Sequence, residues 1–217
     1  MKLLSVVFSF YNEEKNLNEL IDRISAVISK LNDWDYELIF VNDDSNDDSE
    51  KILIAKQKTH PIKVVNMSRR FGVAPCVLAG FEISKGNAVI YMDSDLQDPP
   101  EIITQLIEKF DKGADVVHTK RIKRLGESRL KMFLTKIAYR IINKTSNIPL
   151  PVDSGDFKLL SRRAVDHINS LKEYNPYIRG LTVWVGFKQE FINYVREGRS
   201  SGASKFSSIW SGPMAEF

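Results

Sequence analysis

Short runs of β-branched and aromatic residues alternate with segments of helical apolar spacing through the first half of this 217-residue chain. The expected strands are residues 3–10, 36–41, 62–67 and 88–92, and the expected helices between them are residues 17–31, 48–58 and 73–83. Such an alternation is typical of a parallel sheet with helices on both faces. The sequence therefore predicts an α/β fold with a Rossmann-like, mostly parallel sheet.

The second half of the chain continues this pattern less regularly. Its expected elements are a helix from Pro100 to Phe110, a strand at 114–119, a basic amphipathic helix at 130–142, a helix at 162–171 and a strand at 189–195. No Pro/Gly/Ser-rich stretch divides the chain. We expect one domain over residues 1–210, followed by a tail at 211–217 that is natural or vector-derived.

The composition is that of an ordinary globular domain, with 43% apolar and 27% charged residues. The longest apolar runs are far shorter than the roughly 18 residues of a membrane span. The N-terminus turns polar at Tyr11-Asn12, too early for a secretory signal. A lone Cys76 excludes a disulfide framework and a cysteine metal site. The expected location is therefore cytoplasmic, with peripheral attachment to the membrane left open.

Positive charge is concentrated in one segment. Residues 120–144 contain nine Lys or Arg residues and a single acid, Glu127, although the whole chain carries a formal charge of only +3. A basic segment on an otherwise acidic chain indicates a local anionic partner, such as a phosphate group or a membrane surface. A basic face that is merely solvated is the alternative.

Acidic clusters follow two of the predicted strands. Asp43 and Asp44 come after the second strand, and Asp93 and Asp95 come after the fourth. In parallel sheets, ligands bind beyond the carboxyl ends of the strands. The chain has neither a phosphate loop nor a dinucleotide turn, so a bound diphosphate would need a divalent cation. Asp93 and Asp95 could share one Mg²⁺ or Mn²⁺ with substrate phosphates, although a solvated turn is the alternative.

Five motifs in this order resemble glycosyltransferase family 2, which has the GT-A fold. Within the family, the resemblance is to the polyprenyl-phosphate glycosyltransferases, which include dolichol-phosphate mannose synthase and the bactoprenol glucosyltransferases. The motifs are FSFYNEE at 8–14, VNDDS at 41–45, DSDLQDPPE at 93–101, SGDFKLL at 154–160 and GASKF at 202–206. One motif alone is only suggestive, but the ordered set covers nearly all of the chain.

For the sugar donor, the resemblance implies metal-binding and donor-binding residues between positions 11 and 97 and near the end of the chain. The metal would be held by Asp93, Asp95 and Gln97, with Asp95 also in a catalytic role. The donor contacts would be Tyr11, Asn12, Glu13, Asp43, Asp93, Ser94 and Asp95, together with Arg199 and Lys205 over the diphosphate. Asn42 and Asp44 depart from the Asp and Gly that are common at these positions. Residues 44–48 could instead form a turn that caps the next helix.

For the acceptor, Asp156 matches the acidic residue that the family places where a catalytic base would sit. A phosphate monoester has a second pKa of about 6 and is largely ionised at neutral pH. Asp156 would then orient the acceptor more than deprotonate it, and an Asp that caps the following helix is the alternative. Arg121, Arg124 and Arg129 are the candidates for binding an acceptor phosphate, because a guanidinium binds such oxygens bidentately.

The resemblance therefore implies an inverting transfer from a nucleotide-diphosphate sugar, UDP-glucose-like or GDP-mannose-like, to a polyprenyl phosphate at the cytoplasmic membrane face. Transfer to a polysaccharide or another glycan is one alternative, and a nucleotide-sugar-binding module without turnover is another. No nucleic-acid partner is expected, and a homo-oligomer is left open. Relatives usually continue into membrane spans that this chain lacks, so it is expected to be a truncated or a natural short form.

Overall fold

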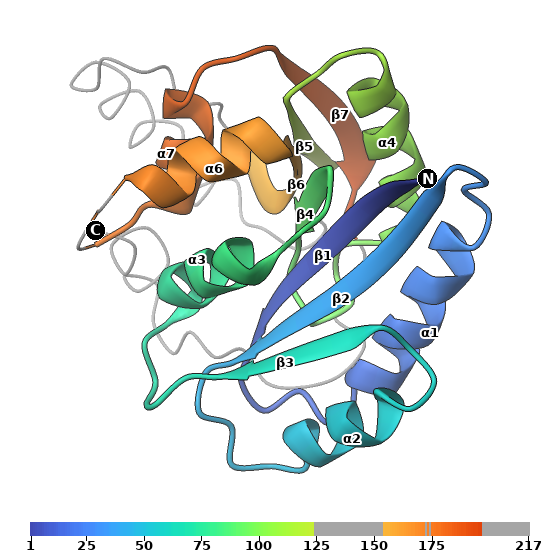
Figure 1. Cartoon of the computed structure of the whole chain (residues 1–217), viewed down its shortest axis with the longest axis vertical. Helices are drawn as coiled ribbons and strands as arrows, with labels where there is room; N and C mark the ends of the chain where they lie inside the picture. Colours follow the sequence, from blue (N-terminus) through green and yellow to red (C-terminus); the bar gives the residue numbers. More distant parts are fainter. Residues whose placement is uncertain (124–153, 172, 174, 197–217) are drawn as a thin grey trace.

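The computed structural model describes residues 1–123, 154–171, 173 and 175–196, in which seven strands form one sheet (Figure 1). The strands are β1 (Lys2–Phe10), β2 (Trp34–Asn42), β3 (Ile62–Asn66), β4 (Ala88–Tyr91), β5 (Val116–Lys123), β6 (Ser154–Ser161) and β7 (Gln189–Val195). Their order across the sheet is β3-β2-β1-β4-β6-β5-β7. The predicted strands of the first half are all present, with ends shifted by at most two residues.

Strand direction brings distant parts of the sequence to one edge of the sheet. β1 pairs in parallel with β2 and β4, β2 with β3, and β5 with β7. Only β6 runs antiparallel to its neighbours β4 and β5 among the described strands. The carboxyl ends of the parallel strands and the amino end of β6 therefore share an edge, which we call the carboxyl edge. The predicted mostly parallel α/β sheet is confirmed.

Helices cover both faces of the sheet (Figure 1). One face carries α1 (Leu17–Ile28), α2 (Ser49–Lys56), the short 3₁₀ helix η1 (Pro100–Ile102) and α4 (Ile103–Asp111). The other face carries α3 (Val73–Ile83), α6 (Arg162–Ser170) and α7 (Ile178–Trp184). Each helix layer encloses a cluster of buried apolar side chains against the sheet. This is the three-layer arrangement that alternating strands and helices favour.

Local sequence explains how these layers pack. The buried side chains of α1 recur every three or four residues, namely Leu17, Leu20, Ile21, Ile24, Val27 and Ile28. On the other face, α3 approaches β1 so closely that a Cβ atom at Gly80 would lie 2.3 Å from Cγ1 of Val7. Only a glycine fits at this contact without a shift of the neighbouring strand.

Two elements in the second half of the chain differ from expectation. Residues 154–161 form strand β6, so the alternative in which Asp156 caps a helix is wrong. The hydroxyl of Ser161 caps α6 instead and accepts a hydrogen bond from the Ala164 amide at 3.3 Å. Helix α7 was not predicted, because its seven residues include Gly180 and too short an apolar stripe. The basic helix expected at 130–142 lies outside the described residues.

Among the described helices, none combines the length and the apolar character that crossing a bilayer requires.

Candidate active site

Four carboxylates and three guanidinium groups meet at the carboxyl edge. The acids are Asp93, Asp95 and Asp98 in the loop after β4 and Asp156 in β6, and the bases are Arg121 in β5, Arg179 in α7 and Arg196 directly after β7. Because Tyr91 is opposite Lys158 in the antiparallel β4–β6 pair, both Asp93 and Asp156 fall just beyond that pair. The strand directions thus bring together acids that the sequence placed about sixty residues apart.

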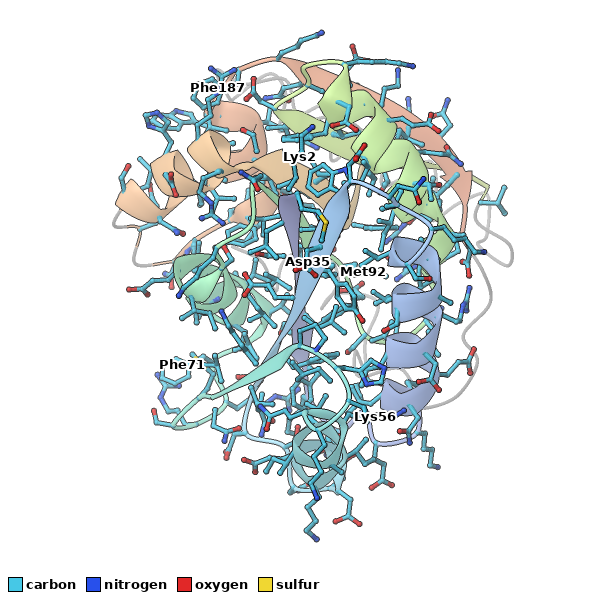
Figure 2. The ribbon with its side chains drawn as sticks, turned by 45° about the vertical axis from the view of Figure 1, so that its right-hand side comes forward. Lys2, Asp35, Lys56, Phe71, Met92 and Phe187 are labelled. Carbon is cyan, nitrogen blue, oxygen red and sulfur yellow. The ribbon has the colours of Figure 1, made fainter. Side chains whose placement is uncertain are left out.

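The loop after β4 presents its acids through a tight backbone turn. Met92 is buried at the end of the strand (Figure 2). The Ser94 hydroxyl then donates to the carbonyl oxygen of Ser9 at 3.4 Å, and the Gln97 amide donates to Oδ1 of Asp95 at 3.1 Å. Leu96 between them has a φ of +59°, which is rare for a bulky residue and costs about 1–3 kcal/mol. Such strain is typical of loops whose shape is needed for function.

The predicted metal ligands lie together in this loop. Carboxylates and an amide oxygen are the hard ligands that Mg²⁺ and Mn²⁺ prefer. In the described part of the chain, no three His, Cys, Asp or Glu side chains form a complete metal site by themselves. The role of Asp93, Asp95 and Gln97 as ligands of one ion shared with a diphosphate stays a prediction.

Arg196 is a site residue that the sequence reasoning missed. Its Nη2 donates to Oδ2 of Asp93 at 3.4 Å and lies 4.0 Å from Oδ1 of Asp95, and its Nε lies 3.1 Å from Oδ1 of Asp98. One cation thus faces three carboxylates. The sequence did contain a signal for this role: Arg196 directly follows the strand predicted at 189–195, and ligands are expected at the carboxyl ends of such strands.

The acids of this edge oppose one another's ionisation. Burial, and then the charges of Asp156, Asp98 and Asp95, raise the pKa of Asp93 to about 8, against the opposite effect of Arg196. The described arginines therefore do not fully neutralise the cluster.

Asp98 is the buried centre of a second group of contacts that sequence reasoning did not assign. Its carboxylate has no exposed surface and accepts a hydrogen bond from the Tyr194 hydroxyl. That hydroxyl accepts from Nε of Arg121 at 3.1 Å, and Nη2 of Arg121 lies 4.0 Å from Asp98. Burial and the neighbouring Asp98 raise the pKa of Tyr194, so it stays a donor. A Cβ atom at Gly155 would come within 3.3 Å of the Tyr194 hydroxyl.

Of the three predicted acceptor-phosphate arginines, only Arg121 is described. It is mostly buried against Asp98 and Tyr194 at the carboxyl edge. Arg124 and Arg129 lie outside the described residues, as do Arg199 and Lys205. Their predicted roles in acceptor and donor binding stay predictions.

Asp156 is paired with Arg179. The guanidinium Nε donates to Oδ1 of Asp156 at 2.8 Å, and Nη2 donates to Oδ2. Burial by itself raises the pKa of Asp156, but Arg179, Lys158 and Arg121 outweigh burial and hold it below its usual value. Asp156 is therefore ionised at neutral pH, and the weak basicity that follows from its lowered pKa suits an orienting group better than a general base.

On the donor side, Asp43 organises the loop that follows β3. Its carboxylate accepts hydrogen bonds from the amides of Phe71 at 2.7 Å and Gly72 at 3.0 Å. The guanidinium carbon of Arg70 lies 4.0 Å from the centre of the Tyr11 ring. The predicted contact of Asp43 with a nucleotide base stays a prediction.

Asn12 and Glu13 join the loop after β1 to the loop after β2. The side chain of Asn12 donates to Oδ1 of Asn46 at 2.8 Å, and the Glu13 amide donates to the Ser49 hydroxyl at 2.9 Å. The carboxylate of Glu13 accepts from the side chain of Asn16 at 2.6 Å. These contacts shape the edge of the predicted nucleoside site, and any contact with a nucleoside stays a prediction.

The departure from the usual family pattern at Asp44 has a structural explanation. Asp44 has a φ of +63°, a left-handed conformation that glycine adopts without strain and that Asp tolerates better than most residues. The turn of the capping alternative is present, since Oδ1 of Asp47 accepts from the amide of Ser49 at 3.0 Å, but the N-cap residue of α2, Asp48, makes no side-chain capping hydrogen bond. Asp44 itself supplies the turn and not the cap.

Comparisons with known proteins agree with this geometry. The glycosyl transferase family 2 profile matches residues 5–168. The chain is 41% identical over 203 residues to the uncharacterized glycosyltransferase YkcC of Bacillus subtilis (strain 168), covering 93% of this chain and 62% of that protein. It is 37% identical over 205 residues to the prophage bactoprenol glucosyl transferase homolog of Escherichia coli (strain K12), covering 94% of this chain and 67% of that protein. The chain thus spans about two thirds of the length of these relatives.

Solved structures share the fold. Glucosyl-3-phosphoglycerate synthase from Mycobacterium tuberculosis, in complex with Mn²⁺, uridine-diphosphate and phosphoglyceric acid, has a TM-score of 0.61 at 23% identity, covering 93% of this chain and 72% of that one. S. aureus TarS in complex with UDP-GlcNAc has a TM-score of 0.61 at 18% identity, covering 94% of this chain and 62% of that one. The profile match and the identity to curated relatives lead to one conclusion: this chain belongs to glycosyl transferase family 2.

Proposed function

We propose that the chain is the catalytic domain of an inverting, divalent-metal-dependent transferase. It moves a sugar from a nucleotide-diphosphate sugar to a polyprenyl phosphate at the cytoplasmic membrane face. The convergence of Asp93, Asp95 and Asp156 at the carboxyl edge carries this proposal. The relatives named as bactoprenol glucosyl transferases support the lipid acceptor.

The metal would be Mg²⁺ or Mn²⁺, and Asp93, Asp95 and Gln97 would hold it. Two observations of the structure support its fit. The side chains proposed as ligands offer only oxygen atoms, and the guanidinium of Arg196 already lies close to the carboxylates of Asp95 and Asp98. When bound, the ion would offset the negative charge of the leaving diphosphate. Asp93 and Asp95 would orient the donor, with Tyr11, Asn12, Glu13 and Asp43 along the nucleoside and Arg199 and Lys205 over the diphosphate.

Asp156 orients the acceptor for in-line attack on the anomeric carbon through a water molecule that donates to its carboxylate and to the phosphate, since two anions do not hydrogen-bond directly. Because a phosphate monoester is already ionised at neutral pH, it needs no general base, and the lowered pKa of Asp156 fits that role. Arg121, Arg124 and Arg129 attract the phosphate headgroup. The basic segment at 120–144 places the domain, taken as residues 1–210, on an anionic membrane surface.

The test is a transfer assay with the full chain, a panel of nucleotide sugars, and a short-chain polyprenyl phosphate or a neutral glycan as the acceptor. We expect transfer to the lipid phosphate, and no transfer in EDTA. Arg129→Ala should lower the catalytic efficiency about ten-fold or more while leaving donor affinity within two-fold, because one charged hydrogen bond is lost. Equal use of a neutral glycan would instead favour a polysaccharide transferase. Donor binding without turnover would favour the binding module.

A further inference from the structure

Two polar side chains of the sheet hydrogen-bond to helix α7 or to its end, and a third supports one of them. Nε2 of Gln189 donates to the carbonyl oxygens of Val183 at 3.0 Å and Gly186 at 2.8 Å, at the end of the helix. Gln189 in turn accepts from Nε2 of His118 at 2.9 Å. Nearer the start, Nζ of Lys158 donates to the Thr182 hydroxyl at 3.3 Å. A seven-residue helix has little stability of its own, so these contacts position it.

The residue that α7 presents to the carboxyl edge is Arg179. Its guanidinium binds both oxygens of Asp156 in a fork, and the side chains of the pair are only 26% and 19% exposed. A forked pair fixes the plane of the carboxylate as well as its position. Each carboxylate oxygen keeps a further lone pair, so Asp156 can still accept a hydrogen bond from a water or a hydroxyl group at the acceptor site.

We propose that Arg179 is the positioning residue of the transfer reaction: it fixes the Asp156 carboxylate in the orientation that meets the acceptor. This inference rests on the proposed function and extends it to a residue that none of the sequence motifs contains. This role of Arg179 explains why α7, a short helix between α6 and β7, is held in place by several hydrogen bonds. Without Arg179, the fork that holds both oxygens of Asp156 would be lost, and the plane of the carboxylate would no longer be fixed.

If Arg179 acts through Asp156, their substitutions will not add. The test is a cycle of four full-length proteins: wild type, Arg179→Gln, Asp156→Asn and the double variant. Arg179→Lys is added as a rescue, because lysine keeps the charge and loses the fork. Arg162→Gln is the matched control, since Arg162 is a comparable partly buried arginine that binds the Gly86 carbonyl at 2.9 Å and the Ser84 hydroxyl at 2.8 Å at the opposite edge.

We expect Arg179→Gln to lower kcat about ten-fold or more, as the loss of a charged hydrogen-bond pair predicts. Donor affinity, measured by calorimetry, should change less than about two-fold, and Arg179→Lys should recover part of kcat. In the Asp156→Asn background, Arg179→Gln should cost less than about two-fold. Arg162→Gln should retain the wild-type kcat.

A purely structural role predicts a different pattern. The losses in kcat would then multiply in the double variant, and the kcat of each single variant would follow its melting temperature, with no rescue by lysine. That result overturns the inference. The wild-type arm tests the proposed function separately: if only a glycan accepts sugar, the acceptor proposal fails and the cycle is measured with that glycan. Absence of any turnover, including donor hydrolysis, overturns both.

Discussion

The guanidinium Nε of Arg196 lies 3.1 Å from Oδ1 of Asp98, a carboxylate with no exposed surface. A buried charge is costly unless it is paired and hydrogen-bonded. The carboxylate of Asp98 accepts a hydrogen bond from the Tyr194 hydroxyl and lies near the guanidinium groups of Arg121 and Arg196, and these contacts offset that cost. The pairing also holds Arg196 beside Asp93 and Asp95, so a structural requirement places a cation at the predicted metal and diphosphate site.

The first prediction concerns this buried acid. Asp98→Asn should lower the free energy of unfolding by about 3 kcal/mol, because Arg121 and Arg196 would lose the charge that they neutralise. Urea unfolding followed by circular dichroism measures the change. Asp22→Asn is the control: Asp22 pairs with Lys56 at 3.0 Å on the surface, and its loss should cost less than about 1 kcal/mol. Equal losses in the two variants would show that Asp98 has no special role.

The second prediction concerns the metal. Asp95→Asn should weaken Mn²⁺-supported binding of the donor and nearly abolish turnover, because one of the two carboxylates proposed as metal ligands is lost. Calorimetric titration of Mn²⁺, with and without the nucleotide sugar, gives a readout independent of activity. Glu82→Gln, a change on the exposed side of α3, should leave both affinities unchanged. Full turnover of the wild type in EDTA would contradict the assignment.

The third prediction concerns backbone strain at Asp44. Asp44→Gly should leave the free energy of unfolding within about 1 kcal/mol of wild type, because glycine accepts the φ of +63°. Asp44→Val should lose about 2 kcal/mol or more, because a β-branched side chain fits this conformation poorly. Both variants are compared by thermal and urea unfolding. If valine were tolerated as well as glycine, the left-handed turn would not be the reason for the glycine that is common in relatives.

The fourth prediction concerns acid stability. Burial and the nearby Lys158 lower the pKa of His118 to about 4, although the hydrogen bond to Gln189 acts in the opposite direction. Between the unfolded-state pKa of about 6.5 and this value, the unfolded chain binds a proton that the folded protein excludes. Because of His118, the free energy of unfolding should therefore fall by up to about 3 kcal/mol as the pH falls from 7 to 4.

The measurement for His118 is the difference in unfolding free energy between wild type and His118→Gln across this pH range. Glutamine does not titrate, so the variant should gain relative to wild type as the pH falls. The variant can be less stable at pH 7, where the His118–Gln189 contact at 2.9 Å is lost. A difference that stays constant with pH would show that His118 does not titrate upon unfolding in this range.

Much of the fold and half of the site could be predicted from the sequence. The stripe of α1 and the apolar runs of β1, β2 and β4 are local patterns, and local patterns are enough to identify such elements. Parallel strands then require Asp43 and Asp93 to lie at the same edge. The acids after β4 were therefore placed correctly at the carboxyl edge without any knowledge of tertiary contacts.

Only the tertiary structure decided the partners of those acids. Strand β6 pairs antiparallel with β4 and β5, and this pairing brings Asp156 close to Asp93. No local sequence pattern reveals the direction of β6. Arg179 looks like an ordinary surface cation in the sequence, and the place of Arg196 after a predicted strand does not reveal its partners. Their roles depend on which carboxylate the folded chain places within hydrogen-bonding distance, as with Tyr194 and Asp98, 96 residues apart. Apolar periodicity is a property of neighbours along the chain, whereas a charge pair is a property of neighbours in space.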